Sequence, residues 1–472
     1  METTYLELSE AEGSTHKFYE VTIEGVETRI RFGRIGEAGQ TQTKIHATPE
    51  KAKAEADKKI KEKLKKGYEL AVPGVRQKRP ITRRQVTSTP STAQRSPILW
   101  RFNSGSPAFG IFIDAQHCWL GNQAGRVFKL DHQGTVVNQY QLPHGVKCIV
   151  ADDIWIYAGC DDGNVYDLTG KLPRLAYEID DQVDIFWLDI YDGILGVSDA
   201  NGGLAKIDAE GEMQWTRLSS GKMAWMVRCD VQGLYHGHAD GITLYDRQQG
   251  RQLWHQPTQG DVLFGWQEDN AVYAGTSARK VYRCRKADGQ PEAIYDCDAS
   301  VYSCATAAAG EYVFAGDSSS SIYCFESSGK RLWKLGTGCG SALSMQVLND
   351  RLYIVTTDGA LACIDVSPAA IQAAQAGELP KVVAIPTPQA TAELPSTLLE
   401  TVSDASTGVI LECFRTNGKL RMRVVSPGYN PEWMVQFPRN LRQEGCRYLV
   451  QVVQPAKQGN FYRVHGDIQK LV

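Results

Sequence analysis

The sequence predicts a mainly β protein whose central part is a seven-bladed β-propeller with a small module on either side. Three observations lead to this prediction. A strand–turn–strand unit recurs in the middle of the chain, an aromatic outer strand follows six of the seven units, and the composition changes near residues 76 and 368. The units repeat at a period of about 40 residues, which is the length of one four-stranded propeller blade. Alternating apolar and polar residues exclude a helical solenoid.

The repeated unit is a short apolar strand, a polar turn and a second strand. The second strands fall 38 to 41 residues apart, at Val127, Val165, Leu204, Thr243, Val281, Ile322 and Leu361. The aromatic outer strands follow at Tyr140, Tyr177, Trp215, Trp254, Tyr295 and Trp333. The seventh unit lacks an outer strand, but residues 98–102 around Trp100 match one. If the strand around Trp100 pairs with the strand around Leu361, the ring closes and leaves no open sheet edge.

Residues 1–75 predict a small α+β module. Residues 17–36 alternate as two antiparallel strands with a turn at Glu24–Gly25, and residues 41–47 form a third strand. Thr48 and Pro49 are the residue types of a helix N-cap and of a first helical position. The helix that follows is expected to bury one face and to stop at Gly67. That face carries Ala52, Ala56, Ile60 and Leu64.

Two linkers and a third module complete the predicted order of domains. Residues 76–96 form a basic and polar linker, and the propeller covers residues 97–367. Residues 368–407 are rich in Ala and Pro and are expected to be a tether with a short helix near Ala369–Ala376. Residues 408–472 hold short strands separated by Gly, Pro and Asn, which predicts a small, basic, barrel-like β-rich domain.

Charge is distributed unevenly along the chain. Residues 1–86 hold 18 Lys and Arg against 13 Asp and Glu, residues 408–472 hold 10 against 4, and the segment between holds 23 against 37. Basic ends on an acidic centre favour an anionic partner such as nucleic acid at the ends. The alternative is that the charge only keeps each part soluble.

Other sequence features argue against cofactors, metals and membranes. The twelve cysteines show no C-x-x-C spacing, so we expect reduced, buried thiols. His236 and His238 would face the same side of a strand, but no third ligand is evident, so no metal site is predicted. No apolar run approaches the ~18 residues of a membrane span, and a cytoplasmic protein without a membrane partner is expected.

The segment from Leu6 to Tyr68 resembles a WGR domain, the module known from DNA-dependent poly(ADP-ribose) polymerases. The match rests on Phe18-Tyr19, Phe32-Gly33-Arg34-Ile35-Gly36, Gly39-Gln40, the helix and Lys66-Gly67-Tyr68. In the polymerases the module grips DNA near a strand end through the Trp and Arg of its motif. No polymerase catalytic domain follows in this chain, so ADP-ribosyl transfer is not expected.

The resemblance implies a nucleic-acid-binding site on this module. Phe32 takes the place of the motif Trp and keeps a stacking face, but it lacks the indole donor. Gly33 and Arg34 match the motif directly, and Arg31 and Lys44 are the supporting cations. The alternative is that Phe32 belongs to the core, that the glycines serve a tight turn and that Arg34 bonds within the module.

The central repeats resemble the PQQ-like, BamB-type repeat. WD40 repeats are a weaker match, because the sequence contains no Trp-Asp dipeptide. The paired cysteines that often lie at the cofactor of quinoprotein dehydrogenases are missing, so no cofactor is expected. The sequence shows no nucleophile–base pair, carboxylate pair or metal cluster, and we therefore expect no enzymatic activity.

The last domain carries a candidate second nucleic-acid surface. Its aromatic and cationic residues interleave as they do in single-strand binders. The residues are Trp433, Arg439, Arg442 and Arg463. The same mixture occurs in many small β cores, which is the competing interpretation.

Two functional hypotheses follow. In the first, the chain is a non-enzymatic DNA-associated scaffold, in which the WGR-like module contacts nucleic acid and the propeller recruits a protein partner. In the second, it is a protein–protein interaction or sensor scaffold with no nucleic-acid binding, and Phe32 in place of Trp favours this alternative.

Overall fold

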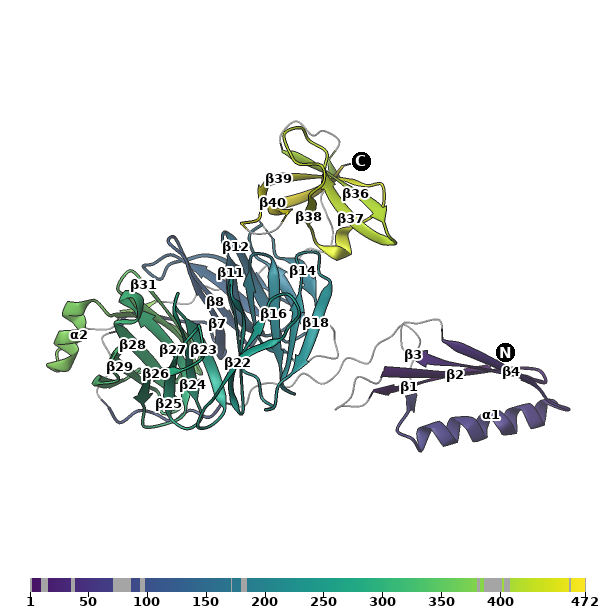
Figure 1. Ribbon diagram of the computed structural model, residues 1–472, viewed down its shortest axis with the longest axis horizontal. Helices are drawn as coiled ribbons and strands as arrows, with labels where there is room; N and C mark the ends of the chain where they lie inside the picture. Colours follow the sequence, from purple (N-terminus) through teal and green to yellow (C-terminus); the bar gives the residue numbers. More distant parts are fainter. Residues whose placement is uncertain are drawn as a thin grey trace. The chain divides into compact units, whose positions relative to one another are not determined.

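The computed structural model describes most of the chain in two compact units. The described residues are 2–9, 16–34, 39–70, 86–93, 98–170, 172–179, 185–379, 383–385, 401–402, 408–457 and 460–471. The units are Met1–Pro80 and Ile81–Val472, and each is described by itself. Figure 1 labels their elements. Neither helix in the described residues is long and apolar enough to cross a membrane.

The first unit is an antiparallel five-stranded sheet with a helix packed against it (Figure 1). Its elements are β1 (Glu2–Ser9), β2 (His16–Glu24), β3 (Glu27–Arg34), β4 (Gln40–Ile45), α1 (Pro49–Leu64) and β5 (Glu69–Leu70). The strand order is β4-β3-β2-β1-β5, so β4 and β5 are the edge strands.

Helix α1 begins where the sequence predicts. The Thr48 hydroxyl accepts a hydrogen bond from the Lys51 amide, and Pro49 occupies the first turn. Ala52 and Ala56 are fully buried, while Leu64 in the last turn is exposed, so the predicted apolar face is shorter than expected. The cluster beneath the helix consists of Leu6, Tyr19, Val21, Ala56 and Tyr68, with Leu8, Ile23, Ile30, Phe32 and Ile60 packed at its margin.

The β2–β3 hairpin turns one residue later than predicted. Glu24 still pairs with Glu27, which leaves Gly25 and Val26 as the two turn residues. Gly25 adopts a left-handed φ of 57°, a conformation that glycine reaches without steric cost. Val26 is therefore exposed at the turn.

The second unit starts with a series of antiparallel four-stranded sheets. The first two contain β7 (Ala108–Ile113), β8 (Cys118–Asn122), β9 (Arg126–Leu130) and β10 (Val136–Gln141), then β11 (Val146–Asp152), β12 (Trp155–Cys160), β13 (Asn164–Asp167) and β14 (Arg174–Glu178). The next two contain β15 (Ile185–Tyr191), β16 (Ile194–Asp199), β17 (Gly203–Ile207) and β18 (Met213–Leu218), then β19 (Met226–Cys229), β20 (Gly233–His238), β21 (Gly241–Asp246) and β22 (Gln252–Pro257).

Two further four-stranded sheets and one larger sheet follow. The four-stranded sheets contain β23 (Val262–Gln267), β24 (Ala271–Thr276), β25 (Lys280–Arg285) and β26 (Pro291–Asp296), then β27 (Val301–Ala307), β28 (Tyr312–Asp317), β29 (Ser321–Glu326) and β30 (Arg331–Gly336), with the 3-10 turn η1 (Ala308–Gly310). The last sheet contains β31 (Ala342–Leu348), β32 (Arg351–Thr356), β33 (Ala360–Asp365), β6 (Ile98–Asn103) and β34 (Val383–Ile385).

The sheets pack around a common centre through their first strands. Each first strand contacts the next in the order β7, β11, β15, β19, β23, β27 and β31, and β31 contacts β7. The predicted pairing across the chain ends is confirmed, because Phe102 pairs with Leu361 and Trp100 with Cys363. A strand from before the first sheet thus completes the last one, as in β-propellers.

Several of the outer-strand aromatic residues join their sheet to the next one. The indole N–H of Trp100 donates to the His132 carbonyl at 3.0 Å, and that of Trp254 donates to the Lys286 carbonyl at 2.8 Å. In each case the acceptor lies 32 residues after the donor. Hydrogen bonds with the same separation join the Trp215 indole to the Arg247 carbonyl and the Tyr295 hydroxyl to the Ser327 carbonyl. A buried aromatic ring with a satisfied donor contributes both apolar area and orientation.

Part of each predicted linker is folded against the propeller. Residues 86–93 hydrogen-bond to it, as described below. Helix α2 (Pro368–Gln375) coincides with the helix expected near Ala369–Ala376, and its Ile371 and Ala374 are buried. Strand β34 pairs in parallel with β6. Residues 71–85, 94–97, 380–382, 386–400 and 403–407 lie outside the described residues.

The end of the chain forms a small closed β-barrel. Its strands are β36 (Val409–Thr416), β37 (Lys419–Val424), β38 (Met434–Gln436), β39 (Arg447–Pro455) and β40 (Phe461–Leu471), with β35 (Thr401–Val402) paired to β40 and the 3-10 turn η2 (Arg439–Leu441). The strand order β40-β38-β37-β36-β39 closes because β39 also pairs with β40.

All twelve cysteines of the chain are free thiols, and ten are buried.

Candidate nucleic-acid interface

The predicted nucleic-acid residues of the first unit lie on both faces of its sheet. On β3, Arg31 pairs with Glu20 across the hairpin and Phe32 pairs with Tyr19. Successive side chains of a strand point to opposite faces, so Arg31 and Phe32 diverge. The Phe32 ring lies 6.2 Å from that of Tyr19, at the margin of the core beneath α1. The two residues therefore do not form one surface.

Arg31 already has a strong partner. Its guanidinium donates two parallel hydrogen bonds to the Glu20 carboxylate, each 3.0 Å long, and its Cζ lies 5.0 Å from the centre of the Phe18 ring. The hydrogen bond to Glu20 is the main reason that the pKa of Arg31 is above its ordinary value. The side chain remains 39% exposed, so a phosphate can approach it but competes with Glu20.

Gly33 has a packing role. A Cβ atom at Gly33 would lie 2.8 Å from the Cα of Gly39, and one at Gly39 would lie 2.5 Å from the Phe18 ring. Gly39 also adopts a left-handed φ of 70°. The two glycines let the start of β4 pass close to Phe18, which supports the structural interpretation of Gly33.

Lys44 is the most accessible of the predicted cations whose side chains are described. It lies on edge strand β4, where all six residues are exposed, and its own side chain is 65% exposed. Its Nζ lies 3.7 Å from Glu55 on α1, which is a loose surface ion pair of little energetic weight. The side chain of Arg34 and residues 35–38 lie outside the described residues.

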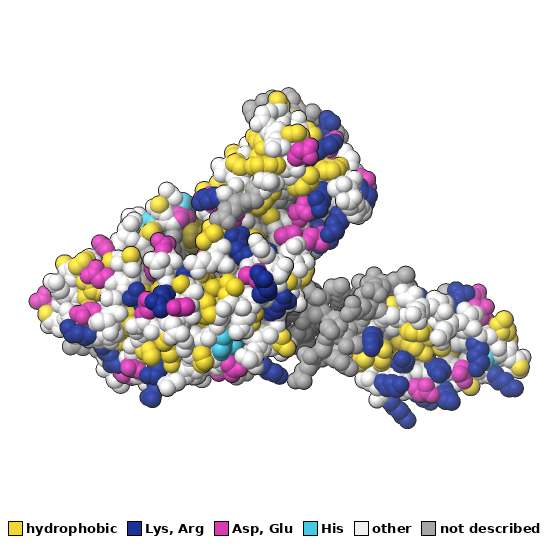
Figure 2. All heavy atoms as spheres, in the orientation of Figure 1, with side chains coloured by type: hydrophobic (Ala, Val, Ile, Leu, Met, Phe, Trp, Pro, Cys, Tyr) yellow, Lys and Arg dark blue, Asp and Glu magenta, His cyan; other side chains and the backbone are white. Residues whose placement is uncertain are grey.

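Helix α1 adds lysines on the side away from the sheet. Figure 2 shows Lys and Arg side chains gathered over this helix, with acidic residues among them. Lys63 differs from the others, because its Nζ lies 4.3 Å from the centre of the Tyr19 ring. Burial, followed by the neighbouring Lys66, lowers the pKa of Lys63.

The acidic partners Glu20 and Glu55 were not predicted from the sequence. The predicted turn at Glu24–Gly25 would place Glu20 opposite Arg29, and only the observed turn at Gly25–Val26 places it opposite Arg31. Glu55 lies on α1 and meets Lys44 only after the helix has packed onto the sheet, so no local pattern could pair them.

The candidate second surface is largely an interface between the barrel and the propeller. Arg463 is only 2% exposed and its guanidinium lies 2.8 Å from the Asp152 carboxylate at the end of β11. Its Cζ lies 3.8 Å from the centre of the Trp155 ring. Burial alone would lower its pKa, but Tyr157 and Asp152 leave the pKa of Arg463 above its ordinary value. Arg463 is therefore not part of an open nucleic-acid surface.

Arg442 and Trp433 are also engaged within the second unit. Arg442 donates to the carbonyls of Phe437 and Leu420 and, at 3.1 Å, to that of Glu210 in the propeller. Burial lowers the pKa of Arg442. The Trp433 ring lies 5.0 Å from the Tyr462 ring at the margin of the barrel core. Arg442 and Trp433 therefore belong to the barrel core and its interface with the propeller, not to the open surface that was predicted.

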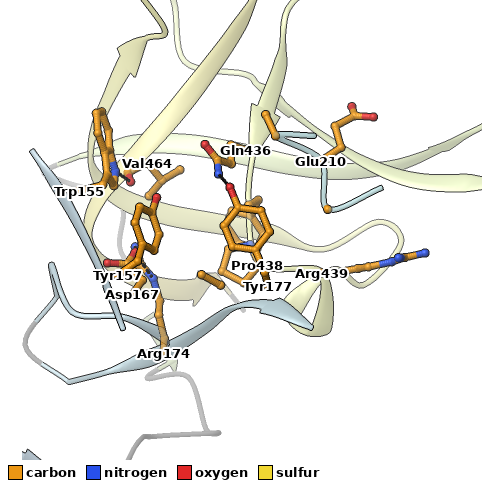
Figure 3. Close-up of a pocket in the computed structure, with 14 residues that line it drawn as sticks. Trp155, Tyr157, Asp167, Arg174, Tyr177, Glu210, Gln436, Pro438, Arg439 and Val464 are labelled. Atoms are coloured by element: carbon orange, nitrogen blue, oxygen red, sulfur yellow. Dashed lines mark hydrogen bonds and ion pairs between the residues drawn. The ribbon is translucent and has the colours of Figure 1, made fainter. Parts of the chain in front are cut away.

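Arg439 lies at the edge of the same interface. It pairs with Glu212 at 3.4 Å and remains 60% exposed. Figure 3 shows it beside a small hollow between propeller and barrel, in which Gln436 faces Tyr177 and Trp155 faces Val464. The hollow holds about 40 Å³, so it is packed protein rather than a ligand site.

The two histidines that resemble a metal pair are buried on β20. His236 and His238 are fully buried with ring centres 5.6 Å apart, and His238 hydrogen-bonds to Thr243, which also contacts His255. Burial lowers the pKa of His236 to about 3. Among the described residues, no group of three or more His, Cys, Asp and Glu is arranged to hold a metal ion.

The fold and its attached modules define the chain as a β-propeller protein with an N-terminal α+β module. Comparison with known families specifies both parts. Residues 2–75 match the WGR domain, and residues 238–426 match outer membrane protein assembly factor BamB. The chain thus joins a WGR domain to a PQQ-like, BamB-like propeller. WGR domains are a family of nucleic-acid-binding modules, and BamB-like repeats form a propeller fold.

Other comparisons add little. Among curated proteins, none matches this chain. A crystal structure of the computationally designed Ika8 protein overlaps 57% of this chain and 100% of its own, with 15% sequence identity and a TM-score of 0.49. A similarity of that degree carries no argument about function.

Proposed function

We propose that this protein is a non-enzymatic, DNA-associated scaffold whose WGR domain contacts nucleic acid and whose propeller recruits a protein partner. The observation that carries the proposal is the WGR match over residues 2–75, together with an exposed polar edge strand that bears Lys44. The contact residues are Arg34, by its match to the family motif, and Lys44, by its exposure.

Charge supports an anionic ligand at this module. Residues 1–86 carry 18 basic and 13 acidic residues, whereas the middle of the chain is acidic. Lysine on an exposed strand contacts phosphates without selecting a base, so binding should depend on salt more than on sequence. The propeller is too acidic to compete for the same ligand.

The scaffold role rests on a closed propeller of seven blades. The seven sheets over residues 98–385, the pairing of β6 with β33 and the contact between β31 and β7 support this number. A groove of about 800 Å³ at its rim, against the barrel, supports partner recruitment. It is lined by charged residues such as Lys206 and Arg251 and by apolar ones such as Val231 and Phe461.

The test is a titration of the full chain with blunt, nicked and single-stranded DNA at two salt concentrations. We expect affinity to fall with salt, with a logarithmic slope of about −0.9 for each phosphate contacted on duplex DNA. Lys44→Ala and Arg34→Ala should each weaken binding to all sequences and reduce that slope by about one.

Lys330→Ala is the matched control. Lys330 lies in the turn after β29 of the propeller, pairs with Glu326 and is 69% exposed, close to the exposure of Lys44. Its loss removes the same charge from the propeller instead of the WGR domain and should leave DNA binding unchanged. The proposal of nucleic-acid binding would be contradicted if no DNA bound at low salt. It would also be contradicted if Lys44→Ala and Lys330→Ala lost the same DNA affinity.

The second candidate function is a protein-interaction scaffold without nucleic-acid binding. Two observations favour it: Arg31 is held by Glu20, and Phe32 packs toward the helix instead of offering a free stacking face. A WGR domain with these features could dock another polypeptide through its exposed β4 edge. The same titration separates the two, because this alternative predicts no binding even at low salt.

A further inference from the structure

The segment that precedes the propeller lies against it in an extended conformation. We call residues 86–93 the docked segment. Its Val86 packs on a cluster formed by Phe109, Tyr302 and Leu343, with Leu263 beside it. Each of these four is the second residue of a first strand, in β7, β27, β31 and β23. Val86 therefore sits where the innermost strands of four neighbouring sheets begin.

The docked segment then follows a row of hydroxyl groups. The Tyr302 hydroxyl donates to the Thr87 carbonyl at 3.1 Å. The Ser88 hydroxyl lies 2.9 Å from that of Ser341 and 3.1 Å from that of Ser320. It also accepts a hydrogen bond from the Ser341 amide at 3.2 Å. A single Ser88 side chain thus joins two sheets, because Ser320 precedes β29 and Ser341 precedes β31.

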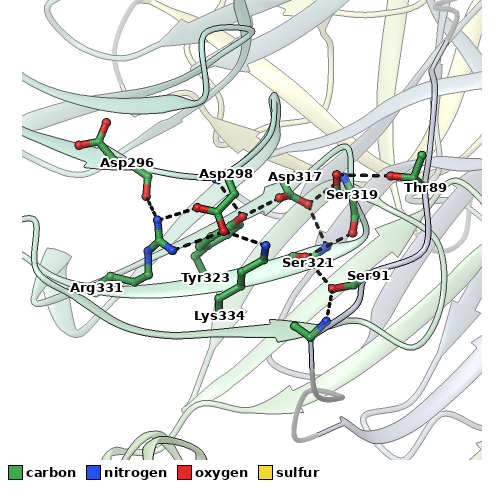
Figure 4. A network of polar contacts seen from close by, with 11 residues as sticks. Thr89, Ser91, Asp296, Asp298, Asp317, Ser319, Ser321, Tyr323, Arg331 and Lys334 are labelled. Atoms are coloured by element: carbon green, nitrogen blue, oxygen red, sulfur yellow. Dashed lines mark hydrogen bonds and ion pairs between the residues drawn. The ribbon is translucent and has the colours of Figure 1, made fainter.

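The turn between β28 and β29 receives the rest of the docked segment. We call Ser318–Ser321 the serine turn. The Thr89 amide donates to the Ser318 carbonyl at 3.1 Å, and the Ser91 hydroxyl lies 2.9 Å from that of Ser321. Figure 4 shows these contacts, with Thr89 and Ser91 on one side and the serine turn on the other.

A buried carboxylate fixes the shape of the serine turn. Asp317 is fully buried and accepts hydrogen bonds from the amides of Ser319 and Ser321, each 2.9 Å long. Its other oxygen accepts a hydrogen bond from the Tyr323 hydroxyl at 2.7 Å. Figure 4 shows this network continuing to Asp298 and Lys334. The surface offered to the docked segment is therefore preorganised and lies in front of a negative charge.

Ser320 is the residue that suggests a binding role. It has a φ of 52°, in the left-handed region that favours glycine. Four corresponding turns have glycine there, at Gly125, Gly163, Gly202 and Gly359, while Arg279 takes the same left-handed conformation in the turn between β24 and β25. A glycine would satisfy the turn without strain, and what serine adds is its hydroxyl contact with Ser88 and Ser341. Strained residues of this kind cluster at ligand-binding sites.

We propose that the serine turn, Ser341 and the apolar cluster around Leu343 form a peptide-binding site of the propeller, which the docked segment occupies within its own chain. The external ligand is an extended, uncharged, Ser/Thr-rich segment of another polypeptide, with an apolar residue two positions before its first serine. The docked segment itself is the template for this chemistry. An acidic residue at the position of Ser88 is disfavoured, because Ser88 contacts Ser320 of the turn that the buried Asp317 carboxylate fixes, and a second negative charge near that carboxylate would be repelled.

The contacts between the docked segment and the propeller allow an external peptide to displace the segment. Of the described hydrogen bonds between the docked segment and the propeller, one joins two backbone groups, and the others involve hydroxyls. Water can replace a hydroxyl hydrogen bond when the segment leaves, so each adds little net affinity. Residues 87–90 and 92 are exposed, which gives a competing strand a place to start. This inference concerns the propeller and does not depend on nucleic-acid binding by the WGR domain.

The test uses the full chain and a dye-labelled peptide with the sequence of residues 84–94. In the variant Val86→Asp with Ser88→Asp, the docked segment should leave its site. Fluorescence anisotropy should then show the peptide binding at least tenfold more tightly to this variant than to the wild type, whose site is filled. Thr92→Asp is the matched control, because Thr92 is exposed in the same segment and should leave the site filled.

Two further measurements decide between binding and misfolding. Adding Ser320→Gly to the released variant should weaken peptide binding by about fivefold, the value of one hydroxyl contact, while circular dichroism shows an unchanged melting temperature or a higher one. A peptide that carries the same two aspartates should not bind. The proposal is overturned if the labelled peptide binds the folded variant no better than the wild type, or if Ser320→Gly leaves its affinity unchanged.

Discussion

Replacement of Arg463 by methionine tests the docking of the barrel onto the propeller. Arg463 and Asp152 are both buried, and their charged groups lie 2.8 Å apart. The Asp152 carboxylate also accepts hydrogen bonds from the amides of Asp192 and Gly193, at 2.7 and 2.6 Å. Methionine keeps much of the side-chain volume but leaves a buried carboxylate without its cation. Removal of one partner from a buried pair costs about 3–5 kcal/mol.

The two amide hydrogen bonds to Asp152 determine how large the loss of unfolding free energy should be within the range of about 3–5 kcal/mol. They continue to stabilise the carboxylate after the substitution, so we expect the lower end, about 3 kcal/mol. The double variant Asp152→Asn with Arg463→Met removes the stranded charge as well and should recover part of the loss. A coupling energy of 1 kcal/mol or more is expected for two groups in direct contact.

The assay is urea unfolding of the full chain followed by tryptophan fluorescence. Trp155, one of ten tryptophans, lies against Arg463, so part of the fluorescence change reports separation of barrel and propeller. Arg439→Met is the control, because Arg439 is 60% exposed and pairs with Glu212 at the rim, where an ion pair contributes about 0–1 kcal/mol. A loss for Arg463→Met no larger than that for Arg439→Met would refute the claim that the buried pair holds the interface.

Two further outcomes follow from buried groups in the propeller. His236 has a pKa of about 3 in the folded chain, against 6.5 ordinarily, so the unfolded chain binds its proton first. Stability contributed by the neutral ring is complete above pH 6.5 and falls as the pH drops toward 3, by about 2 kcal/mol at pH 5. Urea unfolding should show that the free energy of unfolding falls between pH 7.5 and pH 5 by about 2 kcal/mol less in His236→Leu than in the wild type. Gly289→Ala should lower the melting temperature more than Gly211→Ala, because both have a left-handed φ but only the Cβ at Gly289 meets a ring, that of Trp254 at 2.6 Å. Equal shifts would contradict the packing argument.

The periodic part of the fold was predictable from the sequence. Strand length, turn chemistry and the aromatic outer strands recur with each unit, and the missing seventh outer strand pointed to the pairing of Trp100 with the last unit. These features are local or repeat at a fixed spacing, so a single sequence displays them. The N-cap at Thr48 was predictable for the same reason.

The contacts between modules were not predictable in this way. Arg463 is a charged residue, which in sequence indicates an exposed surface. The docked segment is mostly polar, which in sequence indicates a flexible linker. Their partners Asp152 and Ser320 lie hundreds of positions away and are selected by the shape of a surface that exists only after folding. Composition therefore showed that these segments are polar but said nothing about what they touch.

The closure of the last sheet has a consequence for synthesis of the protein. Phe102 and Leu361 pair although they are 259 positions apart in the sequence. At a translation rate of about 5–20 residues per second, β6 waits roughly 10 to 50 s for its partner to leave the ribosome. During that time its apolar residues and unpaired edge are open to wrong partners. Nascent chains that stall before β33 should therefore be prime clients for chaperones.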